Sequence, residues 1–159
     1  MEQKFTEEEI ERAQMPLALL GLTFAFHDKY GEEALETAGN FFYQMGKNIG
    51  EQIKRKLNIQ SDDIQAVTQV YKAFVAQLGQ TIEFKIEGNI ATMLPFEGNC
   101  PPMVATKLLD LPWEKACPTY SWKVSEGLVS AVNPKAKAEV PSFRGRGDPC
   151  CQHVIRIEE

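Results

Sequence analysis

The hydrophobic residues of this chain change their spacing at about Gly79. Before it, from Glu32 to Leu57, apolar residues recur at steps of three and four, which predicts a long amphipathic helix with one buried stripe. After it, from Thr81 to Glu87, apolar and charged residues alternate, which predicts a half-buried β-strand. Helices and antiparallel strands that are segregated along a chain in this way predict an α+β fold.

The remaining elements follow from turn and capping residues. Gly46 and Gly50 would let another helix approach the long helix closely, and Gly88-Asn89 predicts a tight hairpin turn. The fold expected is a set of N-terminal helices and an antiparallel sheet of about four strands from two hairpins, with helices packed on the sheet. The expected helices include 6–14, 16–30 and 32–57. A further helix is expected to be capped by Ser61 or Asp62 and to end at Gly79, and two more are expected to begin at Cys100-Pro101 and at Cys117-Pro118. The expected strands are 81–87, 90–96, 137–143 and 150–157.

Length and charge exclude several classes. With 159 residues and 43% hydrophobic residues, the chain is expected to form one domain over 1–159, with 1–30 as an N-terminal helical extension. A net charge of −5 predicts no nucleic-acid partner, because phosphates require a basic face. The apolar stretch 15–26 contains Pro16 and Gly21 and is shorter than the ~20 residues of a membrane span. Without a secretory signal, a cytoplasmic protein is expected, and its apolar helices could form a homodimer.

Four cysteines in a cytoplasmic protein are expected to be reduced, metal-bound or reactive. Cys100 and Cys117 each precede a proline where a helix is predicted to begin, and a helix N-terminus would lower the pKa of such a thiol. Cys151 and His153 share one face of the last expected strand, 150–157, which we call the closing strand. If that strand folds back beside the helix starts, Cys100, Cys117, Cys151 and His153 could hold zinc. Their spacing matches no standard zinc motif, and the alternative is that the cysteines are small core residues.

Five further residues are candidates for ligand binding. Trp113, Tyr120 and Trp122 surround Cys117 in the sequence and could form the wall of a pocket or simply pack in the core. Arg144 and Arg146 precede the closing strand and could bind a carboxylate, or could be solvated on a hairpin tip. The chain has no nucleophile elbow, phosphate-binding glycine loop or HExxH helix, which removes the commonest enzyme classes.

The segment from Cys100-Pro101 to Gly147-Asp148-Pro149-Cys150-Cys151 resembles the C-terminal half of the L-2-amino-thiazoline-4-carboxylic acid hydrolase-like family. That family is similar to the wider superfamily of four-vinyl reductase domains, aromatic-sensing domains of bacterial regulators and TRAPP trafficking subunits. The small-residue-rich segment 31–53 also resembles a helix of this superfamily. The resemblance implies an α+β fold with an apolar pocket between helices and sheet, and in some relatives a cysteine-bound zinc.

Residue by residue, Cys100, Cys117 and Cys151 match cysteines of the family, Cys150 is an additional thiol, and His153 stands where relatives often have an aromatic residue. Two functions follow as hypotheses. The first is a binding domain for an apolar or aromatic small molecule, with a cysteine-lined and zinc-binding site. The alternative is a hydrolase of a cyclic amidine such as L-2-amino-thiazoline-4-carboxylate, with Arg144 or Arg146 on the carboxylate.

Overall fold

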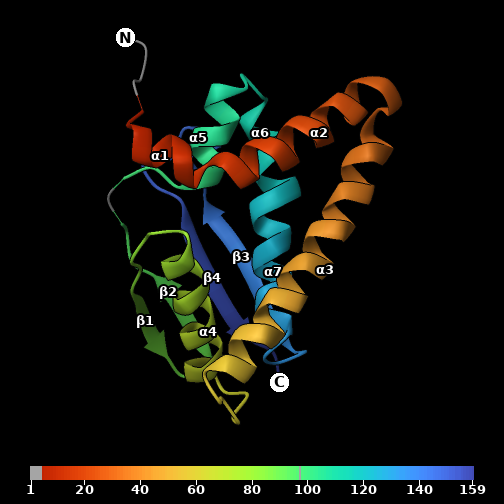
Figure 1. Cartoon of the computed structure of the whole chain (residues 1–159). Coiled ribbons are helices and arrows are strands. Elements are labelled where there is room, and N and C mark those ends of the chain that lie inside the picture. The colour runs from red at the N-terminus through yellow and green to blue at the C-terminus, as the bar shows by residue number, and fades with distance from the viewer. Residues whose placement is uncertain (1–4, 97) are drawn as a thin grey trace.

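Four strands form one antiparallel sheet with the order β1-β2-β4-β3 in a computed structural model that describes residues 5–96 and 98–159 (Figure 1). The strands are β1 (Phe84–Glu87), β2 (Ile90–Met93), β3 (Ala136–Ser142) and β4 (Gln152–Ile157). Both predicted hairpins are present, and β2 pairs with β4 to join them, with Ala91 opposite Ile155. Position 97 and residues 1–4 of the predicted N-terminal extension lie outside the described residues.

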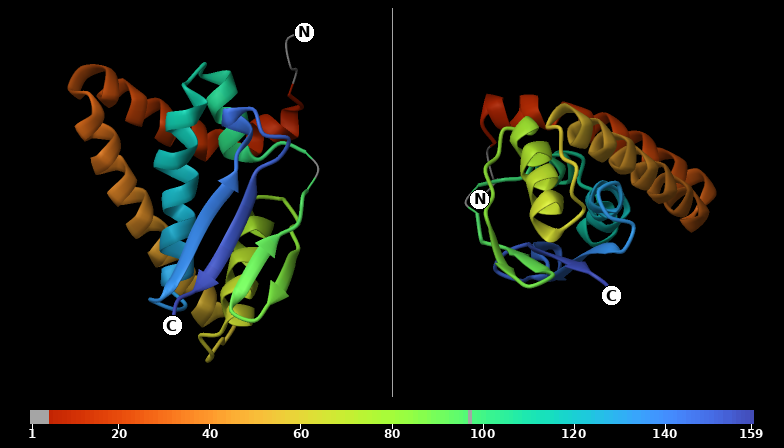
Figure 2. Two further views of the ribbon diagram at one scale, coloured as in Figure 1. Left: turned by 180° about the vertical axis from the view of Figure 1, so that it is seen from behind. Right: turned by 90° about the horizontal axis from the view of Figure 1, so that it is seen from below.

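The helices lie on one face of this sheet, with α4 and α7 directly against it (Figure 2). The predicted α+β fold with N-terminal helices is therefore confirmed. In the described chain no helix has both the length and the apolar character needed to cross a bilayer. The helical elements are α1 (Glu7–Arg12), α2 (Gln14–Tyr30), α3 (Glu32–Lys56), α4 (Ile64–Gln77), α5 (Pro101–Leu108), α6 (Trp113–Cys117), the π-helical segment η1 (Pro118–Trp122), α7 (Lys123–Ser130) and the 3₁₀ turn η2 (Arg144–Arg146).

Glycines bring α3 and α7 into close contact, as the sequence predicted for Gly46 and Gly50. A Cβ atom on Gly46 would lie 2.1 Å from the carbonyl oxygen of Val124, and one on Gly50 would lie 2.8 Å from the carbonyl oxygen of Leu128. Gly127 on α7 completes the contact from the other side, since its Cβ would lie 2.0 Å from the carbonyl oxygen of Tyr43. The two helix backbones therefore touch, which fixes the position of α7 relative to α3.

Two predicted helix starts differ in the structure. The N-cap of α4 is Asp63, whose Oδ1 accepts a hydrogen bond from the Ala66 N–H at 2.8 Å, one residue beyond the predicted Ser61 or Asp62. Cys117-Pro118 does not open a helix, because α6, η1 and α7 follow one another without a break. Proline lacks an N–H and crowds the preceding turn, and a π-helical turn is a common way to accommodate such an interruption.

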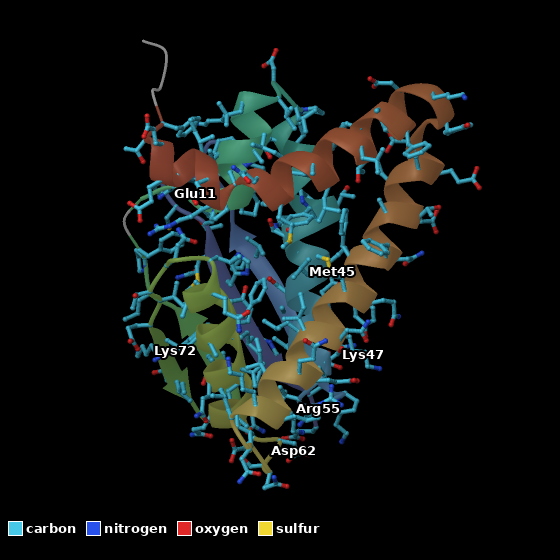
Figure 3. The ribbon with its side chains drawn as sticks, viewed as in Figure 1. Glu11, Met45, Lys47, Arg55, Asp62 and Lys72 are labelled. Carbon is cyan, nitrogen blue, oxygen red and sulfur yellow. The ribbon has the colours of Figure 1, made fainter. Side chains whose placement is uncertain are left out.

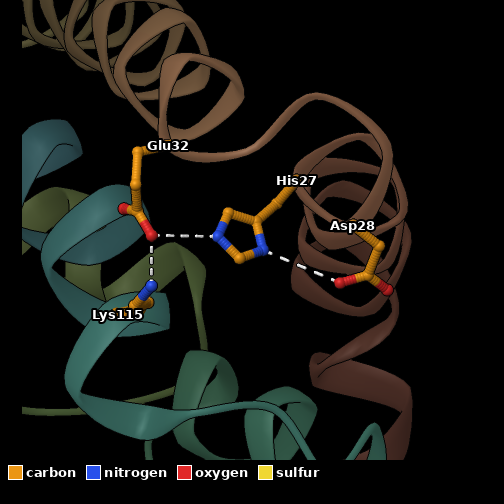
Figure 4. A network of polar contacts seen from close by, with 4 residues as sticks. All are labelled: His27, Asp28, Glu32 and Lys115. Atoms are coloured by element: carbon orange, nitrogen blue, oxygen red, sulfur yellow. Dashed lines mark hydrogen bonds and ion pairs between the residues drawn. The ribbon is translucent and has the colours of Figure 1, made fainter.

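A polar network fixes the turn between α2 and α3 to α6 (Figure 4). Nε2 of His27 lies 3.1 Å from Oε1 of Glu32, and the Lys115 ammonium on α6 forms an ion pair with the same carboxylate. Hydrogen bonds from Lys115 and His27 lower the pKa of the Glu32 carboxyl group. Asp28 is more distant, with 3.7 Å between its Oδ1 and Nδ1 of His27. The contacts of Glu32 with His27 and Lys115 connect α2, α3 and α6 at the surface.

Candidate ligand cavity

A cavity of about 110 Å³ lies between α4, the β1–β2 hairpin, the start of α5, the π-helical segment and the closing strand. It lies where separate hydrophobic clusters of the core meet: Val75 belongs to the cluster on the sheet, Val124 to the cluster under α2 and α3, and Phe143 to a third beside η2. Its lining is mostly apolar and contains no charged side chain among the described residues. The lining residues are Pro16, Tyr71, Phe74, Val75, Leu78, Gln80, Ile82, Met93, Phe96, Cys100, Pro102, Cys117, Tyr120, Ser121, Trp122, Val124, Ser125, Phe143, Cys151 and His153.

Three of the four cysteines line this cavity. Cys100 is the N-cap of α5, Cys117 is the last residue of α6, and Cys151 directly precedes β4. His153 lines the same cavity, as expected for a residue that shares a strand face with Cys151, whereas Cys150 is not part of the lining. The cavity lining therefore contains all four residues that were expected to converge: Cys100, Cys117, Cys151 and His153.

The lowered thiol pKa predicted for Cys100 and Cys117 is wrong. Burial raises the pKa of Cys100 to about 11, although the backbone at Met103 opposes this shift as expected at a helix N-terminus. Burial also raises the pKa of Cys117 strongly, and that residue lies inside a continuous helical segment where no free N–H groups are available. Burial raises the pKa of Cys151 as well. Desolvation outweighs the helix terminus, so all three sulfurs are neutral thiols at pH 7.

The converging residues do not form a metal site in this arrangement. Among residues 5–96 and 98–159, no group of three or more His, Cys, Asp or Glu side chains is placed to hold a metal ion. Nδ1 of His153 is already within hydrogen-bond distance of Tyr71, and the thiol of Cys117 accepts a hydrogen bond from Trp113 Nε1 at 3.0 Å. The predicted ligand set does not fit zinc as it stands, and zinc as a cofactor stays an untested prediction.

A chain of hydrogen bonds, buried at Ser125 and Tyr71 and partly buried at His153, runs along one wall of the cavity. The Tyr71 hydroxyl lies 2.8 Å from Ser125 Oγ and 2.8 Å from Nδ1 of His153. Burial raises the pKa of Tyr71 to about 12 and lowers the pKa of His153 to about 4, so both groups are neutral at pH 7. Nε2 of His153 has no partner in the described chain and is not enclosed by protein atoms, so it is the ring atom left for a ligand.

A second polar group in the cavity is also without an ordinary hydrogen bond. Oγ of Ser121 is buried and makes none in the described chain, although it lies near enough to the Cys117 thiol for a weak hydrogen bond to that sulfur to oppose the rise of its pKa. Sequence reasoning did not select Tyr71, Ser125 or Ser121 as site residues. It placed Tyr71 on the buried stripe of a helix, and a buried tyrosine hydroxyl requires a polar partner, which is the signal that could have led to the chain.

The predicted ligand-binding residues fall into two groups. Tyr120 and Trp122 line the cavity. Trp113 stands behind it, with its ring at the edge of Phe143 and its N–H on Cys117. The guanidinium of Arg144 donates to the Gly98 carbonyl oxygen at 3.3 Å.

Arg146 does not line the cavity either. Arg146 lies on η2, and its guanidinium lies 5.6 Å from the ring centre of Trp122, which is the last residue of η1. Neither arginine is therefore among the described residues that line the cavity. Arg144 lies close enough to Cys100 and Cys151 for its charge to oppose the rise of their thiol pKa values.

The Gly-Asp turn of the sequence motif positions the cysteine strand. Gly147 has a φ of +92°, a conformation that favours glycine, and Asp148 Oδ2 accepts a hydrogen bond from the Phe143 N–H at 2.7 Å. The N–H of Arg144 then points at Sγ of Cys151 at 3.5 Å. The motif thus closes a turn that carries Phe143 and Cys151 into the cavity wall.

Sequence comparison with known protein families finds no match, and comparison with curated proteins finds none either. Among solved structures, the fold is similar to a trafficking protein particle complex subunit 3 from Naegleria fowleri that is covalently bound to palmitic acid. The TM-score is 0.64 at 15% sequence identity, and the match covers 94% of this chain and 96% of the other. The similarity confirms the fold shared with TRAPP subunits, whereas the narrower hydrolase-like family is not supported.

Proposed function

We propose that this chain binds a small, uncharged and mostly apolar molecule in the cavity, with an aromatic ring that carries one hydroxyl or carbonyl group as the best fit. The observation that carries this proposal is an apolar cavity with no charged side chain among the described residues of its lining, together with a neutral histidine nitrogen that has no partner among those residues. A charged ligand would lose its hydration without gaining a counter-charge, which is costly in an apolar site. A neutral ring loses little and can pair with Nε2 of His153.

The size of the cavity supports a ring-sized ligand. An engineered apolar cavity of about 150 Å³ in another protein takes up benzene, and the cavity here is of the same order at about 110 Å³. The palmitic acid on the Naegleria fowleri subunit supports the use of this fold for apolar ligands. A complete long acyl chain would require the cavity in this chain to open further.

The chain of hydroxyl groups behind His153 supports recognition of a hydroxyl or carbonyl. In one arrangement Ser125 donates to Tyr71 and Tyr71 donates to Nδ1 of His153, so that Nε2 carries the ring proton and is a donor. In the reverse arrangement Nδ1 donates to Tyr71 and Tyr71 donates to Ser125, so that Nε2 is an acceptor. A ligand hydroxyl satisfies either arrangement. A ligand that leaves Nε2 unpaired would lose the free energy of one buried hydrogen bond, about 1–3 kcal/mol.

The alternative function, hydrolysis of L-2-amino-thiazoline-4-carboxylate, has less support. Its carboxylate would meet no cation among the described lining residues, and the guanidinium groups of Arg144 and Arg146 contact Gly98 and Trp122. The thiols of Cys100, Cys117 and Cys151 are held protonated by burial, and a protonated thiol is a poor nucleophile.

Calorimetric titration with phenol and with benzoate at neutral pH tests the proposal, because the two probes have similar rings and differ in charge. Phenol is expected to bind and to raise the melting temperature, and benzoate is expected to do neither. In His153→Phe, which keeps a ring but removes Nε2, phenol affinity should fall by about 5- to 150-fold, the equivalent of about 1–3 kcal/mol. Leu78→Trp, which adds bulk at the cavity wall, should abolish binding in a protein that still folds.

Two results would overturn the assignment. Equal affinity for phenol and benzoate would show that the absence of charge in the lining does not select the ligand. Turnover of L-2-amino-thiazoline-4-carboxylate that is lost in Cys100→Ser or Cys151→Ser would establish the hydrolase instead.

A further inference from the structure

The longest strand of the sheet lies at its edge. β3 has 7 residues and pairs with β4 on one side only, whereas the opposite edge is formed by β1, which has 4 residues. Natural sheets usually keep an exposed edge short or cover it, because unpaired N–H and C=O groups attract another strand. Pro141 blocks the end of β3, since it has no N–H. The described residues leave 136–140 without a second partner strand, and we call this open side of the strand the β3 edge.

The β3 edge offers backbone hydrogen-bonding groups. Just before the strand, the carbonyl oxygen of Lys135 accepts a hydrogen bond from the Glu158 N–H at 3.1 Å. In an antiparallel pair every second residue directs its N–H and C=O to the neighbouring strand, so Lys137 and Glu139 direct theirs to β4 as well. The N–H and C=O of Ala138, between them, therefore point away from β4 and are free for an added strand.

A groove of about 330 Å³ runs along the β3 edge. β3 forms one wall and lies beside α7, which together with α3 provides the other wall (Figure 2). Ala136 and Ala138 are on the buried side of β3, and their small side chains leave room between the strand and the helices. Among the described residues the groove shares no lining residue with the ligand cavity.

The helical wall of the groove offers hydrogen-bond acceptors. The Tyr43 hydroxyl donates to Ser130 Oγ at 3.0 Å, and Ser130 Oγ donates in turn to the Gly127 carbonyl oxygen at 2.8 Å. Because its proton is used in this way, the Tyr43 oxygen keeps lone pairs for a donor in the groove. Glu126 accepts from Lys123 through Oε2 at 2.9 Å, which leaves its other carboxylate oxygen for a second donor.

The charges of the groove favour a basic occupant. The charged residues of the described lining are Glu126, Lys137, Glu139 and Glu158. Glu139 has only a loose contact with Arg156, at 3.9 Å, and Glu158 makes no ion pair in the described chain. Lys47 and Arg55 on α3, which Figure 3 labels, are not among the lining residues. Three carboxylates against one ammonium group are complementary to lysine and arginine side chains.

A second copy of β3 fits this groove less well than a single added strand. If two β3 edges paired antiparallel, the two sheets would be continuous and both helical layers would lie on the same face. The α7 of the second copy would then meet α3, which contributes Tyr43 to the groove. A peptide strand without helices of its own avoids this contact.

We propose that the β3 edge binds an extended peptide segment with lysine or arginine at alternate positions, on the side that faces Glu126. The segment adds a fifth strand to the four-stranded sheet and exchanges hydrogen bonds with the N–H and C=O of Ala138. In this mode of recognition the main-chain bonds give affinity and the alternate side chains give specificity. The site is separate from the ligand cavity and does not depend on what the cavity binds.

Amide NMR spectra of the full chain test this proposal, with a seven-residue peptide that alternates lysine and threonine as the probe. The signal of the Ala138 N–H is expected to shift on titration, and the signals of β1 are expected to stay. The same peptide with N-methylated amides keeps its charges but cannot donate to β3, so it should bind on the order of 10-fold more weakly. A peptide that alternates glutamate and threonine should not bind.

Variants of the chain locate the site. Ala138→Pro removes the outward N–H at an edge position, where proline is tolerated, and should weaken binding of the lysine peptide about 2- to 12-fold. Glu126→Gln should weaken it about 2- to 5-fold at low salt. Glu87→Gln is the matched control, because it makes the same charge change on β1 at the opposite edge of the sheet and should leave the affinity unchanged.

Three results would overturn the proposal. If the Ala138 signal does not shift at millimolar peptide, the β3 edge does not accept a strand. If the N-methylated peptide binds as tightly as the plain one, the contact is one of charge alone. If the β3 signals shift with protein concentration and without peptide, the edge pairs with a second copy of this chain instead.

Discussion

Protonation of His153 is expected to destabilise the folded protein between pH 7.5 and pH 5. Burial lowers the pKa of His153 from 6.5 in the unfolded chain to about 4 in the folded protein. Between these values the unfolded state binds a proton that the folded state does not, so stability is present at high pH and is lost as pH falls from about 6.5 towards 4. The other titratable groups of the described cavity lining, Tyr71, Cys100, Cys117, Tyr120 and Cys151, are neutral throughout this range.

The magnitude follows from the two pKa values. Since a tenfold ratio corresponds to about 1.4 kcal/mol, lowering the pH from 7.5 to 5 should remove about 2 kcal/mol of unfolding free energy through His153. Carboxyl groups add their own pH dependence, and a variant without the imidazole removes only the His153 contribution. His153→Asn is suitable because its amide oxygen can still accept from Tyr71.

Urea denaturation of wild type and His153→Asn at pH 7.5, 6 and 5 measures the difference. The wild-type protein should lose about 2 kcal/mol more than the variant between the first and last pH. The same loss in both proteins would refute the reasoning, because it would mean that the ring is solvated and titrates normally. The chain contains two histidines, and His27→Gln, which removes the surface one, should leave the difference intact.

The helix contact and the thiols allow two further tests. Gly127→Ala should destabilise the protein by about 1–2 kcal/mol in urea denaturation, because the added Cβ would meet a backbone oxygen. The control is Gly39→Ala, whose Cβ would lie 3.5 Å from its nearest contact and which should be neutral or stabilising. The opposite order of stability would contradict the close α3–α7 packing. Thiol titration should find Cys100, Cys117 and Cys151 slow to react until the protein unfolds, with no effect of a chelator. About one zinc per chain and thiols released by the chelator would show instead that these residues bind metal.

The fold could be predicted from the sequence because its signals are local. The steps of three and four apolar residues in 32–57 and the alternation in 81–87 each depend on a single element, and the Gly88-Asn89 turn fixes a hairpin without help from elsewhere. The join between β2 and β4 has no such local signal. Pairing of Ala91 with Ile155 connects residues far apart in the chain and depends on the packing of both hairpins against the helices.

The site could be predicted only in part, because pKa values depend on burial. The sequence placed Cys100 at a helix N-terminus, which is correct, and strand alternation placed Cys151 and His153 on one face, as the cavity lining has them. The sequence could not show that desolvation outweighs the helix terminus. Nor could it show that Arg144 and Arg146 are not among the described lining residues, since their partners, Gly98 and Trp122, come from other segments.

Adjacent phenylalanines on α3 offer a matched test of the cavity wall. Phe42 is 2% exposed, and its ring meets that of Tyr120 edge-on at 4.8 Å, so it supports one wall of the cavity from behind, while it also lines a groove between α2 and α3. Phe41 is 57% exposed and lines the same groove. Phe42→Leu should weaken phenol binding about 2- to 12-fold, the equivalent of an aromatic pair worth ~0.5–1.5 kcal/mol. Phe41→Leu should leave phenol affinity unchanged in calorimetric titration. Equal losses of phenol affinity in both variants would contradict this assignment, because they would mean that the groove and the cavity form one site through the Phe41 and Phe42 rings, whose centres are 5.6 Å apart.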